Sequence, residues 1–76
     1  MNDQRRKAIE AVLIELADLR ARVEAIQQEE QEAFDNMPEG LQQTPNGQAS
    51  EAAASALDDA LGAFDEIASS LDEAKA

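Results

Sequence analysis

Two stretches of this chain repeat apolar residues at alternating intervals of three and four positions, and a segment rich in Pro and Gly separates them. Such intervals are typical of an α-helix that packs along one seam, because seven residues nearly complete two helical turns. The first repeat comprises Ile9, Val12, Leu16, Leu19, Val23 and Ile26, and the second comprises Ala53, Leu57, Ala60, Phe64, Ile67, Leu71 and Ala74. The sequence therefore predicts two long helices.

The separating segment, "MPEGLQQTPNGQ", contains signals that end one helix and begin another. Pro38 disfavours helical geometry at the residue before it. Thr44 is followed by a proline, which is the pattern of an N-cap and a first helical residue. Ser50 is a competing start. We expect a first helix over about residues 3–36, a turn over about 37–45 and a second helix over about 46–74.

A short connection makes two helices antiparallel neighbours, so the expected fold is all-α: a two-helix hairpin with a heptad seam in a single domain, residues 1–76. Further apolar residues widen the seam beyond what two helices can cover. We expect two hairpins to pack as a homodimeric four-helix bundle. The alternative is a hairpin that awaits a partner's apolar groove. The expected core and oligomer seam comprises Leu13, Leu16, Leu19, Val23, Leu57, Leu61, Phe64, Ile67 and Leu71.

The chain is strongly acidic, with 17 acids against 6 bases and a net charge of −11. Direct binding to nucleic acid or anionic lipid is disfavoured, because both depend on Lys and Arg. Cys and His are absent, which excludes disulfides, zinc sites and imidazole chemistry. No apolar run approaches the ~18 residues of a membrane span. We expect a cytoplasmic protein with no enzymatic activity, cofactor, metal or small-molecule substrate.

In the second helix an apolar residue is followed by two acids in three successive heptads. These pairs fall opposite the seam, so they should form one continuous solvent-facing row with a ~10.5 Å repeat, which we call the acidic ridge. No base occurs from Val23 through Ala74, although like charges four residues apart destabilise a helix. The ridge is therefore either a binding surface or a solubilising one. It comprises Asp58, Asp59, Asp65, Glu66, Asp72 and Glu73.

A second acidic patch precedes the turn and comprises Glu29, Glu30, Glu32 and Asp35. The heptad register places Glu30 on the seam, where a buried carboxylate without a partner is costly. Either the helices splay at this end, or Glu30 finds a donor such as Gln48. The patch is either a solvated bundle end or a polar mouth that docks a basic group.

The bases have local partners. Arg20 and Arg22 can pair with Glu24 and Asp18, each four residues away on the same helix. In an antiparallel hairpin, the bases at positions 5–7 lie beside the carboxyl end of the second helix, whose acids and exposed carbonyls they neutralise.

The stretches "EEQEAFDNMPEG" and "GQASEAAASALDDAL" resemble a set of small acidic helical proteins encoded by tailed phages and prophages. These proteins share a basic opening, a leucine-rich helix, an E-E-x-x-A-F/Y-D-N-x-P-E turn and repeated apolar-acid-acid units. The resemblance implies a small accessory phage product acting in the host cytoplasm, a class in which inhibitors of host proteins are common. It implies no active-site residues. Its most distinctive positions are Phe34, Asp35, Asn36, Pro38 and Glu39.

Two functions follow from these patterns. In the first, the acidic ridge binds the basic, nucleic-acid-binding surface of a host protein and acts as an inhibitor or decoy. In the alternative, the chain is a structural or assembly module that acts only through helix packing and homo-oligomerisation, and its acids keep it in solution.

Overall fold

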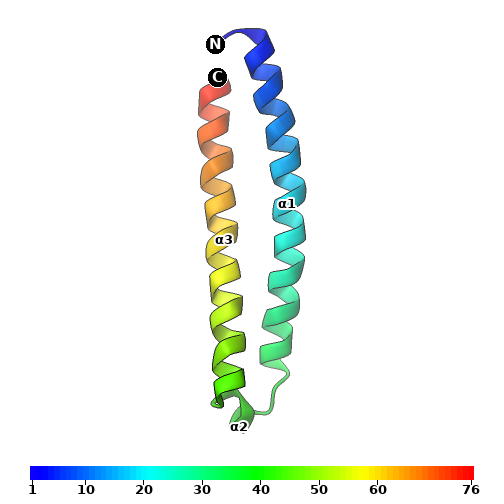
Figure 1. Cartoon of the computed structure of the whole chain (residues 1–76), viewed down its shortest axis with the longest axis vertical. Helices are drawn as coiled ribbons and strands as arrows, with labels where there is room; N and C mark the ends of the chain where they lie inside the picture. Colours follow the sequence, from blue (N-terminus) through cyan, green and yellow to red (C-terminus); the bar gives the residue numbers. More distant parts are fainter.

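A computed structural model describes all 76 residues. The chain is helical throughout, with α1 (Asp3–Asp35), α2 (Glu39–Gln42) and α3 (Pro45–Lys75) in order. Helices α1 and α3 lie antiparallel, with α2 at the turn and both termini at the opposite end (Figure 1). The expected all-α hairpin is confirmed. The long helices begin and end within one residue of the predicted bounds, whereas α2 was not predicted.

The hairpin is a rod of 58 × 15 × 13 Å. Its length follows from the length of its helices, since about 33 residues at ~1.5 Å each span about 50 Å. Neither long helix contains an apolar stretch that would let it cross a membrane.

Both long helices begin at side-chain caps. Asn2 Oδ1 accepts a hydrogen bond from the Arg5 N–H at 2.8 Å, and Thr44 Oγ1 accepts one from the Gly47 N–H at 3.3 Å. These bonds satisfy N–H groups that have no partner inside the first helical turn. Helix α3 therefore begins after Thr44, and Ser50 lies inside it.

The turn is tied to both long helices. The side-chain amide of Gln42 donates to the carbonyl oxygens of Phe34 and Met37 at 3.1 and 3.2 Å, which closes the end of α1. On the other side, Gly47 packs against the backbone of α2. A Cβ at Gly47 would lie 2.5 Å from the carbonyl oxygen of Leu41, so only glycine fits there.

The contact between α1 and α3 buries little surface completely. Only Gly47, Ser50, Ala54 and Leu61 are buried, and most other side chains at the contact are half-buried. On α1 all the half-buried residues except Glu24 recur at intervals of three and four: Arg6, Ile9, Leu13, Leu16, Arg20, Val23, Gln27, Glu30 and Phe34. On α3 all the buried and half-buried residues except Ala60 recur in the same way: Gly47, Ser50, Ala54, Leu57, Leu61, Phe64, Ala68, Leu71 and Lys75.

This contact differs from the predicted seam at every second position. In α1 the predicted residues Val12, Leu19 and Ile26 are 48%, 44% and 53% exposed, and the residues that follow each of them face α3 instead. In α3, Ile67 is likewise 50% exposed, while Ala68 after it faces α1. Leu19 and Ile67, both predicted in the seam, therefore lie outside the contact between the helices.

Apolar side-chain size does not explain the rotation. The rotation brings Leu13 and Leu61 into the contact and keeps shared positions such as Phe64 inside it. It also takes four large apolar side chains out of the predicted contact, namely Val12, Leu19, Ile26 and Ile67. What the observed rotation gains is a polar contact, because Arg20 of α1 now reaches both carboxylate oxygens of Asp65 on α3.

Candidate interaction surfaces

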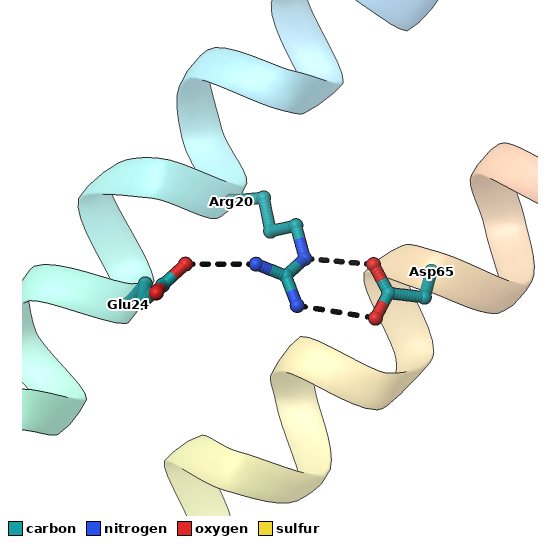
Figure 2. Close-up of polar contacts among 3 residues, drawn as sticks. All are labelled: Arg20, Glu24 and Asp65. Carbon is teal, nitrogen blue, oxygen red and sulfur yellow. Dashed lines mark hydrogen bonds and ion pairs between the residues drawn. The ribbon is translucent and has the colours of Figure 1, made fainter.

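Arg20 lies at the centre of one face of the hairpin, between three carboxylate oxygens. Its Nε and Nη2 donate to Asp65 Oδ1 and Oδ2 at 2.7 and 3.1 Å, and its Nη1 donates to Glu24 Oε2 at 2.8 Å (Figure 2). The local pair with Glu24 was expected. The pair with Asp65, which joins α1 to α3, was not, because it depends on how the helices are rotated.

This geometry is the two-pronged arrangement in which a guanidinium binds a carboxylate most strongly. The hydrogen bonds from Arg20 lower the pKa of Asp65 below its ordinary value, and the same contact raises the pKa of Arg20. Both side chains remain accessible, with 35% and 61% of their surfaces exposed. Asp65 is therefore ionised and held in place at neutral pH.

All six residues of the acidic ridge are exposed, but they do not form an unbroken negative row. Asp65, at the centre, is paired with Arg20, and Asp72 Oδ1 lies 3.7 Å from Lys75 Nζ. The expectation of one uniform ridge is thus corrected. Four carboxylates keep no cation within 4 Å: Asp58, Asp59, Glu66 and Glu73.

The acidic patch before the turn contains one carboxylate that is held inside the contact. Glu30 Oε1 accepts a hydrogen bond of 2.6 Å from the buried Ser50 hydroxyl. The predicted donor, Gln48, is wrong: its amide donates instead to the carbonyl oxygen of Gln43 at 3.4 Å. Ser50 faces α1, whereas Gln48 precedes it by two residues, or about 200° around the helix. The helices therefore need not splay to accommodate Glu30.

The rest of this patch is exposed. Glu29, Glu32 and Asp35 have no cation within ion-pair distance, and Asp35 accepts a hydrogen bond of 3.0 Å from the Gln31 amide. The turn end of the rod is therefore negative and without a compensating base.

At the opposite end of the rod, a base of α1 binds the carboxyl end of α3, as expected. Arg6 Nε donates to the carbonyl oxygen of Lys75 at 3.0 Å, and its Nη1 lies 3.2 Å from Asp3 Oδ1. Arg5 and Lys7 are exposed and have no carboxylate within 4 Å. The hairpin thus carries free positive charge at its termini and free negative charge at its turn.

Another side of the hairpin is apolar. On α1 the residue just before a contact residue is apolar at three places, namely Val12, Leu19 and Ile26. On α3 the residue just before a contact residue is Ile67 or one of three alanines. One position along a helix corresponds to a turn of about 100° around its axis. Because the helices are antiparallel, residues that come one position before a contact residue lie on the same side of the hairpin in both helices. We call this side the apolar face. It comprises Val12, Leu19, Ile26, Ala53, Ala60, Ile67 and Ala74.

The apolar face and the Arg20 cluster lie on opposite sides of the rod. Asp65 follows Phe64, a contact residue, by one position, whereas Ala60 and Ile67 precede contact residues by one position. On one helix, a residue that comes just after a contact residue and a residue that comes just before one lie on opposite sides of the contact. The carboxylates do not converge anywhere on the molecule: no group of three or more lies close enough to hold a metal ion.

No model of a protein family matches the chain, and no curated protein or solved structure matches it either.

Proposed function

We propose that the protein is a non-enzymatic binding module whose acidic ridge engages the basic, nucleic-acid-binding surface of another protein. The observation that carries this proposal is the set of four exposed carboxylates on α3 with no cation within 4 Å, namely Asp58, Asp59, Glu66 and Glu73. A basic groove that accepts phosphates also accepts carboxylates presented on a rigid scaffold.

A helix is a suitable scaffold for such a ridge. The acidic pairs recur every seven residues, or about 10.5 Å along the axis, and the backbone of α3 is already ordered before binding. Little conformational entropy is then lost on association. The central pair contributes less than its neighbours, because Arg20 already neutralises Asp65. The resemblance to phage proteins supports the role of an inhibitor or decoy in the host cytoplasm.

The test is affinity capture of a basic partner from host lysate, followed by elution at increasing salt. The ridge variant replaces Asp58 and Asp59 by Asn and Glu66 and Glu73 by Gln. The control variant removes the same charge elsewhere: Glu10→Gln, Glu32→Gln, Asp35→Asn and Glu39→Gln. The ridge variant should lose the partner and the control should keep it. If both variants retain or both lose the partner equally, the ridge is not the binding surface.

A second candidate function is assembly through helix packing, in which two hairpins dimerise as a four-helix bundle. The apolar face favours it: four large apolar side chains on one side are 44% to 53% exposed, while Leu61 is the one large apolar side chain that is buried. A core this small leaves an isolated hairpin marginally stable. Leu16, Leu19, Phe64, Ile67 and Leu71 would then carry the function.

The two functions respond differently to one pair of variants. Leu19→Asp places a charge on the apolar face and should abolish assembly, whereas the ridge variant should leave assembly unchanged or strengthen it by relieving repulsion. Sedimentation equilibrium of both variants decides between them. Assembly that survives Leu19→Asp would overturn the second candidate.

A further inference from the structure

We propose that the apolar face is covered by a second copy of the chain that lies antiparallel to the first, with the two turns at opposite ends and a two-fold axis at Leu19. This inference rests on the assembly function and specifies its geometry. It is carried by the area of the apolar face, by the charges at the two ends of the rod and by the side chains that a dyad at Leu19 brings together.

The area is sufficient for a stable dimer. The two longer dimensions of the hairpin, 58 and 15 Å, bound a face of about 870 Å². Stable protein–protein interfaces bury roughly 800 Å² on each partner. The apolar side chains occupy the middle of this face, from Val12 to Ile26 on α1, and extend from Ala53 to Ala74 on α3.

Charge decides the direction of the second copy. If the two turns lay together, the free carboxylates of Glu29, Glu32 and Asp35 of both copies would be gathered at one end of the dimer, with no base among them. In the antiparallel arrangement each acidic turn lies beside the basic start of the other α1. Arg5, which has no carboxylate partner within its own hairpin, would then lie within one helical turn of Glu29 of the second copy.

The side chains of α1 determine the register. With Leu19 on the dyad, Leu19 meets Leu19 of the second copy. Val12 then meets Ile26 of the second copy, because the residue numbers of facing positions on two antiparallel helices add up to the same total. The same register brings Glu15 level with Arg22 of the second copy. Within its own hairpin Arg22 reaches only Asp18, at 4.0 Å, and Glu15 has no partner.

Helix α3 is compatible with the same dyad. Pairing Ala60 with Ile67 of the second copy sets a small side chain against a large one and places the centre between residues 63 and 64. The Arg20–Asp65 ion pair shows that this part of α3 lies level with Leu19 and Arg20 of α1. Both helices therefore fit one two-fold axis, as a closed dimer requires.

A spin label and a cross-linker test this arrangement. The chain has no cysteine, so a single introduced one is unique. A label at Gln43→Cys in the turn should report a distance between copies close to the 58 Å length of the rod. A copy with its turn on the same side would give less than about 30 Å, since packed helices lie ~10 Å apart. Leu19→Cys should cross-link to itself through a short bis-maleimide, whereas Ile14→Cys, 73% exposed on another side of α1, should not.

A charge swap tests the register. Glu15→Arg should weaken the dimer on the order of tenfold, because it sets a second guanidinium against Arg22 of the other copy, and Arg22→Glu should act similarly by opposing two carboxylates. The double variant Glu15→Arg/Arg22→Glu should restore the wild-type dissociation constant, because both pairs are rebuilt with reversed sign. Double-variant dimers no stronger than the single variants overturn the register.

The outcomes separate this inference from the assembly function on which it rests. A chain that stays monomeric at all concentrations overturns both the dimer and its geometry, and leaves the acidic ridge proposal standing. A dimer with a short distance between turns and no Leu19 cross-link overturns only the antiparallel arrangement. A long distance between turns together with the Leu19 cross-link supports it.

Discussion

Arg20 of α1 and Asp65 of α3 form the one direct ion pair between the two long helices, through Nε–Oδ1 and Nη2–Oδ2 contacts of 2.7 and 3.1 Å. This bidentate contact connects the rotation of α1 to that of α3. They also remove the central carboxylate from the acidic ridge. The same pair thus influences the packing of the hairpin and the charge of its surface.

The pair predicts a pH dependence. The pKa of Asp65 is lowered from its ordinary value of 3.8 by the hydrogen bonds from Arg20, so the pair stabilises the folded state above about pH 4 and loses this effect as the pH falls through the lower folded-state value. Asp65→Asn should therefore lower the thermal midpoint at pH 7 and should approach the wild type near pH 2. Thermal unfolding followed by circular dichroism across this range measures the difference.

Asp58→Asn is the matched control, since Asp58 occupies the equivalent position one heptad earlier and has no cation within 4 Å. Its replacement should raise or leave unchanged the midpoint at pH 7, because it removes repulsion without removing a pair. A constant gap between Asp65→Asn and the wild type from pH 7 to pH 2 contradicts the assignment.

Added salt should stabilise the protein. With 17 acids against 6 bases, repulsion between carboxylates outweighs the few ion pairs. The Debye length falls from ~10 Å at 0.1 M to roughly 4–5 Å at 0.5 M salt, which screens the repulsion between neighbouring residues of the ridge. The thermal midpoint should rise over this range at fixed protein concentration. A flat or falling response would show that the acids do not crowd one another.

Glycine at position 47 should be irreplaceable, whereas Gly62 should not. A Cβ at Gly47 would lie 2.5 Å from the Leu41 carbonyl oxygen, in the backbone of α2, so Gly47→Ala should destabilise the hairpin by more than about 1 kcal/mol despite the better helix propensity of alanine. At Gly62 nothing lies within 4 Å of the added carbon, and Gly62→Ala should stabilise by about 0.5–1 kcal/mol.

Urea unfolding at a fixed protein concentration compares the two glycine variants, which differ in position and not in chemistry. If Gly47→Ala is as stable as Gly62→Ala, α2 does not pack against the first turn of α3 in solution.

The hydrogen bond of 2.6 Å between Ser50 and Glu30 should contribute to stability, because it satisfies a carboxylate inside the contact between the helices. Ser50→Ala should cost about 1–3 kcal/mol by leaving Glu30 without its donor. The exposed Ser55 provides a control, since Ser55→Ala should be neutral or slightly stabilising through helix propensity.

The double variant Ser50→Ala/Glu30→Leu removes both polar groups and should recover much of the loss. Urea unfolding of the two single variants and the double variant measures their coupling. Equal stability of Ser50→Ala and Ser55→Ala would argue that Glu30 is solvated and makes no such bond.

The helices and their ends were predictable because their signals are local. Heptad spacing, and Thr44 followed by a proline, act within one or two turns of chain, so neighbouring residues suffice to interpret them. The choice between Thr44 and Ser50 as the start of the second helix was decided only by the observed cap. The pairing of Arg20 with Glu24 was predictable for the same reason, since four residues on one helix always place side chains together.

The rotation of the helices, and everything that depends on it, was decided only in the tertiary structure. Apolar residues lie on both sides of the shared contact residues Leu16 and Phe64, so the predicted contact and the observed one are both possible from the sequence. The two differ by a rotation of a few tens of degrees in each helix. That angle moves Leu19 and Ile67 out of the contact and joins Arg20 to Asp65. Periodicity specifies which residues share a helix face, whereas the energies of packing and ion pairing between helices select the face that is covered.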